Sequence, residues 1–557
     1  MHWRQHKISC NAPISKENWR PAFEAENRAP AWLPEKGHQP LNAQQWRDWT
    51  NHNLTEHWLY DDLPAIDVLK LSENEGSKTT EMNILFAASG GLANLIMTVN
   101  NLPTDTTTRL RVVLNDRDSA VVLRDLTLLL MAFTAQDSLA TAECAVHFWY
   151  SQFIPQWCLG AITSQIGPSL KDVPSFPGMN ESFDTDHMYS KTWTFGSRST
   201  LTTELTRLEC SRLFILLFFT VPPFPPLTPI ENASNLSLKR PWDGTGDNRD
   251  DWDAILARLP SKWRVARERY HQETIVWPFG QPRDSNWIMN PNYFPLGFGG
   301  LAMKPASDPL ASWPITKVME TIEGKASNDV YGKSFYYVRN QFRMFVERLR
   351  TLDIHVEVYC RDAKDLPKKL DGVQFDRIDA SSLGENRRWD TISATPMLDT
   401  LGPMLKGRAE NPHATLVSAY PFLFFEVQEN MKEAERMAMF REAISPNSAD
   451  LATIGAYLPP SAPEWKRKLG LRFLKDYEAL WKFYYSNMDK FDSSYSTKIP
   501  IAPKPRQTIV ESWPLQVKDP SARVANGVAA AAAQQEFNYL FATAQKPTTR
   551  FVEWQRQ

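Results

Sequence analysis

Two adjacent glycines, Gly90 and Gly91, separate two apolar segments of the chain. The stretch from Met82 to Ile96 is M-N-I-L-F-A-A-S-G-G-L-A-N-L-I, which predicts a strand, a tight turn and a helix. Nucleotide-binding domains begin in this way, because glycine lets backbone N–H groups approach a cofactor without a Cβ in between. The chemistry to be weighed is therefore cofactor binding. The alternative is that both glycines serve only the turn.

Strands and helices alternate in two separate parts of the sequence. The first part predicts strands at 83–88 and 110–114 and helices at 92–100 and 119–133. The second part predicts helices at 333–350 and 396–405 and strands at 354–360, 374–380 and 413–419. Such alternation favours an α/β fold with a parallel, doubly wound (Rossmann-like) sheet.

The expected domain organisation follows from where this alternation stops and resumes. A long insertion between two halves of one sheet costs little extra loop-closure entropy. A proline cluster at 221–229 predicts a linker or surface strap within the insertion. We expect a finger remnant at 1–10, an irregular segment at 11–80, the first half of the Rossmann-like domain at 81–134, a mainly helical insertion at 135–332, the second half at 333–420, and a mainly helical C-terminal region at 421–557.

Composition excludes several classes of function. Lys plus Arg total 62 and Asp plus Glu total 64, so the charge balance gives no footprint for nucleic acid or an anionic membrane. Five scattered cysteines do not make a disulfide framework and indicate a reducing compartment. No apolar run approaches the ~20 residues that a membrane span needs, and the polar N-terminus is unlike a signal peptide. We expect a cytoplasmic protein.

The common catalytic motifs are missing from the sequence. It contains no G-x-x-x-x-G-K-[ST], no G-x-S-x-G and no H-E-x-x-H. N-P-N-Y at 290–293 imitates the N-P-P-Y loop of amino-group methyltransferases, but it precedes the expected third strand and its third residue differs. The aromatic segment at 277–287 is either a recognition surface or a packed strap, and packing is favoured.

Several segments resemble a known family. N-I-L-F-A-A-S-G-G and V-V-L-N-D-R-D-S-A-V-V-L-R-D-L-T-L-L-L resemble domain-of-unknown-function family 4470, which occurs in many fungal proteins and in the dynein axonemal assembly factors of ciliated organisms. Further segments resemble the same family: R-Y-x-x-E-T-I-V-W-P-F-G (269–280), D-P-L-A-S-W-P (308–314), F-D-R-I-D-A-S-S-L-G (375–384) and T-I-V-E-S-W-P-L (508–515). This resemblance spans about 50 to 520 in scattered motifs.

The sheet of this family resembles that of class I methyltransferases, which implies positions for S-adenosylmethionine. Gly90 and Gly91 match the middle of the expected G-x-G-x-G turn. Asp116 stands where an acid would bind the ribose hydroxyls, and Asp362 stands where an acid would contact the adenine. The resemblance thus implies that Gly90, Gly91, Asp116 and Asp362 would bind the cofactor.

Two further positions depart from that pattern. Phe86 occupies the place of the acid in the first strand, and Ala88 occupies the place of the first glycine. The acids also have structural alternatives. Asp116 or Asp118 is suited to cap the helix expected from residue 119, and Asp362 is suited to cap a short turn.

The first ten residues, with H-W-R-Q-H-K-I-S-C, resemble the last turn of a MYND zinc finger. In that resemblance His6 and Cys10 are the last two zinc ligands, on one helical face at i and i+4. A structural zinc site needs four ligands, and the sequence offers no others nearby at the right spacing. Zinc binding is therefore expected only in a longer gene product.

These observations favour a non-catalytic protein-interaction or assembly factor on a degenerate methyltransferase-like domain. No cofactor and no catalytic residue is assigned under that hypothesis, and the expected partners are other proteins. The rival hypothesis is an S-adenosylmethionine-dependent methyltransferase with an atypical cofactor turn. A third is a cleft that binds another nucleotide or small ligand as a stability switch.

Overall fold

The computed structural model describes residues 12–28, 30, 63–76, 79–173, 187–218, 248–282, 286–293, 308–383, 395–421, 448–486, 500–524, 527–543 and 547–557. The chain divides into two compact units. Unit 1 is drawn from residues 1–65, 119–191 and 205–350, and unit 2 from residues 66–118, 192–204 and 351–557. Each unit therefore combines segments that are far apart in the sequence.

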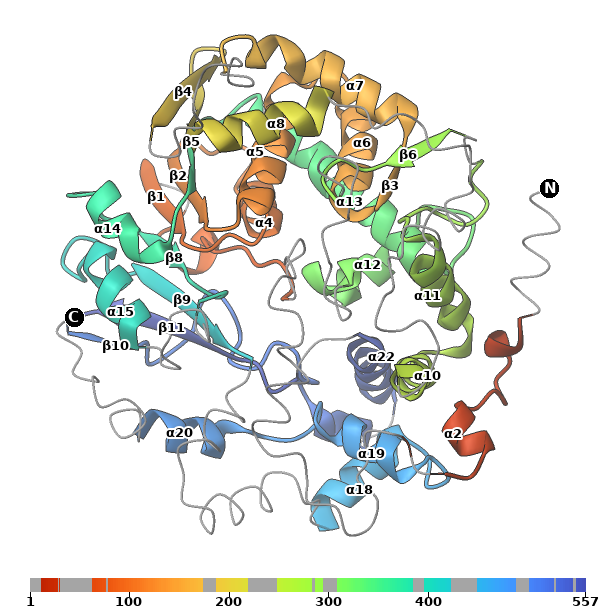
Figure 1. Cartoon of the computed structure of the whole chain (residues 1–557). Coiled ribbons are helices and arrows are strands. Elements are labelled where there is room, and N and C mark those ends of the chain that lie inside the picture. Colours follow the sequence, from red (N-terminus) through yellow and green to blue (C-terminus); the bar gives the residue numbers. More distant parts are fainter. Residues whose placement is uncertain are drawn as a thin grey trace. The chain divides into compact units, whose positions relative to one another are not determined.

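A parallel sheet forms the centre of unit 2 (Figure 1). Its central strands lie in the order β9-β8-β1-β2-β7, and each pairs in parallel with its neighbour. Their bounds are β1 Glu81–Phe86, β2 Arg109–Asp116, β7 Asp353–Cys360, β8 Arg377–Asp379 and β9 Thr415–Tyr420. The sequence pattern predicted all five, and the α/β class with a mostly parallel sheet is confirmed.

Four more strands extend this sheet to nine. On the β7 side, β5 (Ser199–Thr206) pairs with β7 in parallel and β4 (Met188–Phe195) forms the edge. On the β9 side, β11 (Arg550–Arg556) is antiparallel to β9, and β10 (Ile501–Pro503) is antiparallel to β11. The sequence analysis expected mainly helices in the regions that supply these four strands.

The division into units also separates elements that the sequence pattern joined. The helices α5 (Ser119–Thr134) and α13 (Val330–Leu349) lie in unit 1, whereas β2 and β7, their neighbours in sequence, lie in unit 2. The two contact-defined units thus cut across the expected ranges 81–134 and 333–420. The linker expected at 221–229 lies outside the described residues.

Helices form most of the rest of the described chain (Figure 1). In unit 1, in addition to α5 and α13, they are α2 Ala22–Ala25, α6 Ser138–Tyr150, α7 Gln156–Ile166, α8 Arg207–Phe218, α10 Asn248–Arg258, α11 Ser261–Glu273 and α12 Ile315–Glu320. Unit 1 also contains a two-stranded sheet of β3 Phe153–Pro155 and β6 Trp287–Met289. In unit 2 they are α4 Ala93–Asn100, α14 Leu366–Lys369, α15 Thr395–Leu401, α18 Ser448–Tyr457, α19 Glu464–Leu471, α20 Glu478–Ser486 and α22 Val528–Ala542.

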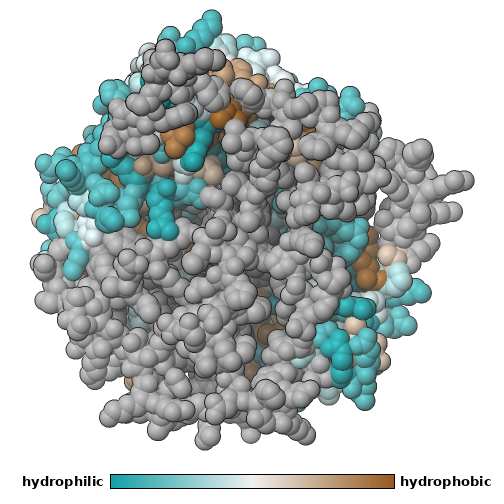
Figure 2. All heavy atoms as spheres, viewed as in Figure 1, coloured by the Kyte–Doolittle hydropathy of each residue, from teal (hydrophilic) through white to brown (hydrophobic). Residues whose placement is uncertain are grey.

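Burial explains why β1 and β2 form the middle of the sheet. Ile84, Leu85, Val112 and Val113 are 0% exposed, as expected for parallel strands that are covered on both faces. A hydrophobic cluster in unit 2 combines side chains of the sheet with those of α15 and α20. On the face seen in Figure 2, the coloured residues are mainly hydrophilic, with smaller hydrophobic areas among them.

Within the C-terminal region that was expected to be mainly helical, α19 and α20 are two separate helices. The side chain of Asp476 accepts a hydrogen bond from the N–H of Glu478 at 2.8 Å, so it supplies a partner for an amide at the start of α20. Gly470 in α19 lies against Ile454 and Phe537, where an added Cβ would be within 3.0 to 3.2 Å of their side chains. α19 is thus closely packed at Gly470, and Asp476 accepts from the first residue of α20.

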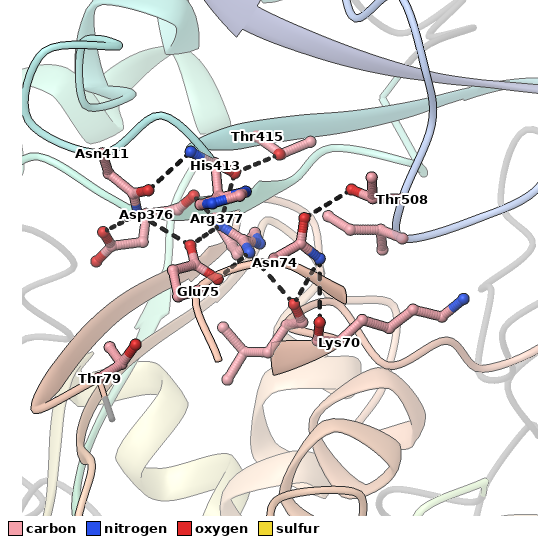
Figure 3. Close-up of polar contacts among 12 residues, drawn as sticks. Lys70, Asn74, Glu75, Thr79, Asp376, Arg377, Asn411, His413, Thr415 and Thr508 are labelled. Atoms are coloured by element: carbon pink, nitrogen blue, oxygen red, sulfur yellow. Dashed lines mark hydrogen bonds and ion pairs between the residues drawn. The ribbon is translucent and has the colours of Figure 1, made fainter. Parts of the chain in front are cut away.

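A buried polar network lies at the amino end of β8 (Figure 3). We call it the amino-end network and define it by Glu75, Asp376, Arg377, Lys406 and Asn411. The guanidinium of Arg377 donates to the two carboxylate oxygens of Glu75, at 2.7 Å each. Asp376 accepts from Lys406 Nζ at 2.9 Å and from Asn411 Nδ2 at 2.7 Å. These buried charges are paired with opposite charges, as burial requires.

A second buried carboxylate, that of Glu553 in β11, holds a neighbouring segment. Its Oε1 accepts from three consecutive backbone N–H groups, those of Thr508 at 2.8 Å, Ile509 at 2.6 Å and Val510 at 3.1 Å. Lys504 Nζ lies 3.5 Å from Oε2. Successive N–H groups that converge on one anion form a stable binding arrangement, so Glu553 fixes the segment 504–510 against the last strand.

Candidate functional site

The carboxyl ends of β1, β2, β7 and β8 meet at one edge of the sheet in unit 2. The strand order reverses at β1, because β2 and β7 follow on one side and β8 and β9 on the other. In open α/β sheets, ligands bind outside the carboxyl ends of the strands at such a switch point. The residues that follow these four strands, which we call the carboxyl edge, are therefore the candidate site.

The turn after β1 is held by its neighbouring strands. Ala87 N donates to Asp379 O at 2.9 Å, and Ser89 N donates to Asn115 O at 2.8 Å. Gly90 has a φ of 60°, in the left-handed region that favours glycine, whereas Gly91 lies outside that region and is buried. The turn leads into α4, whose first N–H groups have no intrahelical acceptor.

We expect Gly90→Ala to lower the free energy of unfolding by about 1–2 kcal/mol, because a side chain resists the left-handed conformation. Chemical denaturation of the full chain measures this change. Gly90→Asn is the matched control, because asparagine tolerates that conformation better. It should recover part of the loss, and an equal or larger cost for Gly90→Asn would contradict the role assigned to φ.

Asp116 is the last residue of β2, and its carboxylate bonds to backbone. Its Oδ2 accepts from Gly90 N at 3.1 Å, and its Oδ1 accepts from Asp118 N at 2.8 Å. The structure thus brings Asp116 and Gly90 together, as a cofactor site that contains both residues would require. Both carboxylate oxygens of Asp116 receive a backbone N–H, so this acid ties the β1 turn to the end of β2.

Asp362 lies two residues past Cys360, which is the register partner of Asp116 in β7. Its side chain accepts from Lys364 N at 3.1 Å and lies 3.4 Å from Lys364 Nζ. It is the cap of the 3-10 turn Ala363–Asp365, as the structural alternative predicted. Asp116 therefore ends β2 and Asp362 follows the end of the adjacent β7, and each accepts from a backbone N–H at the carboxyl edge.

Asn115 and Asp379 are two residues of the carboxyl edge that the sequence analysis did not assign. Asn115 is 1% exposed, and its Nδ2 donates to Ala87 O at 2.9 Å and to Arg361 O at 3.0 Å. It therefore joins the ends of β1, β2 and β7. Its Oδ1 is buried and has no hydrogen-bond partner among the described residues. Asn115 follows the strand expected at 110–114, but a single Asn at that place does not indicate such a role.

Asp379 ends β8 and is buried, with 5% of its surface exposed. Its carboxylate accepts from Asn94 Nδ2 of α4 at 2.7 Å and from Ser381 N at 3.0 Å. Burial raises the pKa of Asp379, and these hydrogen bonds oppose that rise. An acid at the end of the expected strand 374–380 was the available sequence signal for this residue.

The arrangement at the carboxyl edge holds strands and turns together. Asp116, Asp362 and Asp379 each accept at least one backbone N–H from a residue that follows a strand. In the part of the chain that the structure describes, no three His, Cys, Asp or Glu side chains are grouped to hold a metal ion. His6 and Cys10, the expected zinc ligands, lie outside the described residues. Among the described helices, none is long and apolar enough to cross a membrane.

The N-P-N-Y segment at 290–293, which differs from the methyltransferase loop in its place and in its third residue, lies in unit 1. Asn290 is 0% exposed, and its Nδ2 donates to the carbonyls of His147, Phe148 and Ser151 at 2.8–3.2 Å. Tyr293 donates through its hydroxyl to Trp149 O at 2.6 Å. This segment therefore caps the C-terminal end of α6 within unit 1.

The aromatic segment that begins at Trp277 is also packed within unit 1. Val276 N donates to Ser151 Oγ at 3.0 Å, and Phe279 N donates to Asp329 Oδ2 at 2.6 Å. The ring of Trp277 stacks on His147, with centroids 5.2 Å apart. These contacts fit a strap, and it crosses the end of α6 and the start of α13.

A protein-family model matches part of the chain. The family described as "Domain of unknown function (DUF4470)" matches residues 59–154. No curated protein and no solved structure matches the chain. The matched span contains β1, α4 and β2 with Gly90, Gly91 and Asp116, and the other family-like segments lie outside it. The chain is thus similar to this family of unknown function over the first strand–turn–helix unit of its candidate site.

Proposed function

We propose that this chain is a non-catalytic protein-interaction or assembly factor built on a degenerate methyltransferase-like domain. One observation carries the proposal: Asp116, the acid in the ribose-binding position, has both carboxylate oxygens bonded to backbone N–H groups of its own edge. An acid in that position of a cofactor site would offer its oxygens to ribose hydroxyls. Here the same group stabilises the turn.

The strand order supports a domain of nucleotide-binding ancestry. When β4 and β5 are left out and the remaining strands are numbered along the chain, the order β7-β2-β1-β8-β9 becomes 3-2-1-4-5, which doubly wound dinucleotide-binding sheets share. Antiparallel β11 departs from that pattern at the next place. Phe86 and Ala88 replace the expected acid and first glycine, so the domain keeps the framework and lacks part of the cofactor signature. A cytoplasmic location is part of this proposal.

The second candidate is binding of S-adenosylmethionine at the carboxyl edge. Two observations favour it: the left-handed Gly90 in the turn after β1, and the buried Oδ1 of Asn115, which has no partner among the described residues. A buried acceptor costs free energy unless a donor reaches it. A ligand hydroxyl or amino group, or water, is suited to supply that donor. Catalysis would need in addition a base or acid that faces the substrate.

Affinity capture of the tagged full chain, followed by cross-linking and mass spectrometry, tests the proposal. We expect at least one partner protein at a fixed stoichiometry, with cross-links to defined surfaces of this chain. The captured material should transfer no label from methyl-labelled S-adenosylmethionine. Recovery of the chain without any cross-linked partner, or labelled product that requires Asp116, would contradict the proposed function.

A further inference from the structure

The N-terminal segment 12–28 lies on the helices α10 and α11 of unit 1 (Figure 1). It consists of the 3-10 turn Pro13–Ser15, an extended stretch and the short helix α2. The charged side chains that hold it come from the two helices: Asp250 and Asp253 from α10, and Arg264 from α11. We call these three residues and the surface around them the α10–α11 surface.

Arg264 binds the first part of the segment through its main chain. Its Nη1 donates to Ile14 O at 3.3 Å and to Lys16 O at 3.2 Å, while its Nε donates to Leu256 O at 3.0 Å. The guanidinium also lies over the ring of Trp19, 5.0 Å from the centroid. Arg264 is 7% exposed, so a buried charge satisfies carbonyls at the end of the turn.

Two carboxylates bind the second part of the segment. Asp253 Oδ2 accepts from Ala22 N, the first residue of α2, at 2.6 Å. Asp250 forms a two-pronged ion pair with Arg28, with the Nη1–Oδ2 distance at 2.5 Å and the Nη2–Oδ1 distance at 2.7 Å. Asp250 is 2% exposed and Asp253 8% exposed, so both acids are desolvated at this surface. Burial raises the pKa of Asp253.

Phe23 is the apolar anchor of the segment, and it is 1% exposed. A buried aromatic anchor, a stacked Trp and a bidentate Arg are the residue types that dominate binding energy at protein interfaces. The layout is Trp19, Phe23 and Arg28, or W-x3-F-x4-R, with the short helix starting just before Phe23. The remaining contacts are to main-chain groups, which any sequence of the same conformation presents.

We propose that the α10–α11 surface is a peptide-binding site, occupied in this chain by its own segment 12–28, and that it takes a partner-protein segment of the same W-x3-F-x4-R layout. Without an occupant, Arg264, Asp250 and Asp253 would lose partners that now compensate their burial. A tethered segment competes with a free peptide at an effective concentration of about 1 mM. The partner must therefore displace the tethered segment, which makes that segment an internal competitor.

The test is fluorescence anisotropy with a labelled synthetic peptide of residues 12–28. In the full chain, Phe23→Ala with Arg28→Ala weakens the tethered segment, and we expect this variant to bind the peptide with a Kd below about 100 µM. Wild-type chain should bind about tenfold more weakly, because its own segment competes. Adding Arg264→Met and Asp250→Asn to the weakened chain should abolish binding.

The control is the same peptide carrying Phe23→Ala and Arg28→Ala, which should not bind. Equal binding of both peptides to the folded, weakened chain, or no binding at 1 mM, would overturn the proposal. If the double variant does not fold, Arg28→Ala alone takes its place, because the Arg28 side chain is partly exposed. A peptide affinity of the Arg28→Ala chain that is no higher than that of the wild-type chain would then overturn the proposal. A wild-type dimer that the peptide dissociates would make a second copy the occupant, which also overturns the assignment to a partner protein.

This inference goes beyond the proposed function, because it concerns unit 1 and not the carboxyl edge. A chain that binds the peptide yet captures no cellular partner would support the site for the chain's own segment and count against both its use by a partner protein and the assembly role. A chain with a partner cross-linked elsewhere and no peptide binding would overturn the peptide-binding site and support the assembly role. The two outcomes are therefore distinguishable.

Discussion

Glu75→Gln is expected to lower the free energy of unfolding by about 3–5 kcal/mol at pH 7, because it leaves the Arg377 guanidinium buried without its counter-charge. Arg377 is 1% exposed, and both oxygens of Glu75 accept from it. Arg377 also donates to Val68 O at 3.0 Å and to Leu69 O at 3.2 Å. Loss of Glu75 therefore weakens the attachment of the whole segment before β1. Denaturant titration of the full chain measures the change.

The effect of Glu75→Gln should depend on pH. Burial by itself would raise the pKa of Glu75, but the charge and hydrogen bonds of Arg377 lower it below its ordinary value. A carboxyl group whose folded-state pKa is lowered stabilises the fold above its unfolded pKa, and this stability is lost as the pH falls through the folded value. The difference between wild type and Glu75→Gln should thus be constant near neutral pH and shrink below about pH 4.5.

Glu73→Gln is the matched control for Glu75→Gln. Glu73 is two residues away, and its exposed carboxylate lies 3.8 Å from Lys70 Nζ. Exposed pairs of this kind contribute about 0–1 kcal/mol, so the control should change stability little at any pH. The role of the amino-end network would be contradicted if Glu75→Gln lowered the free energy of unfolding no more than Glu73→Gln does, or if its effect grew at acid pH.

Glu553→Gln is expected to lower the free energy of unfolding by about 3 kcal/mol, since it removes a fully buried charge from three N–H donors and a lysine. The backbone N–H groups of Thr508, Ile509 and Val510 share Oε1 of Glu553, which is 0% exposed. A neutral amide keeps one acceptor oxygen but turns an NH2 group toward donors. Hydrogen exchange at 508–510 should accelerate together with the loss of stability.

Glu511→Gln provides the control for Glu553→Gln. Glu511 follows the same segment, but its carboxylate is exposed and pairs with Lys518 at 2.8 Å. We expect this control to leave both stability and the exchange of the 508–510 amides nearly unchanged. Slow exchange at 508–510 in Glu553→Gln would mean that the carboxylate does not hold the segment.

Much of the sheet could be predicted from the sequence, because buried parallel strands are short apolar runs that alternate with helices. The strands expected at 110–114 and 354–360 correspond to β2 and β7 within one or two residues. The expected strand 374–380 shortens to β8, which has three residues. Strand periodicity carries little information over so few residues.

The four added strands were missed for different reasons. β10 has three residues and contains Pro503, so it gives almost no strand pattern. β11 (Arg550–Arg556) does not alternate between apolar and polar residues, since Phe551, Val552, Glu553 and Trp554 are buried in succession. β4 and β5 alternate, but they lie among helices and far from β7 in the sequence, so that only the fold reveals their pairing.

For the candidate site, the sequence indicated positions and gave no contacts. Gly90 was assigned from the turn and Asp116 from the resemblance to methyltransferases, and the structure brings these two residues within hydrogen-bonding distance. Which N–H groups donate to the Asp116 carboxylate depends on φ at Gly90 and on the turn after β2, and neither can be obtained from residue types alone. Asn115 and Asp379 were missed because their partners lie on other strands and on α4.

The most direct test of the central claim is an unfolding titration of wild type, Asp116→Ala and the exposed-loop control Asp105→Ala, with and without 1 mM S-adenosylmethionine. If Asp116 holds the β1 turn, its loss should cost about 1–2 kcal/mol, and the ligand should change none of the three proteins. A ligand at a hundred times its Kd would stabilise the folded state by about 2.7 kcal/mol. A stabilisation of that size in wild type and Asp105→Ala, absent from Asp116→Ala, would contradict the claim and make the carboxyl edge a cofactor site.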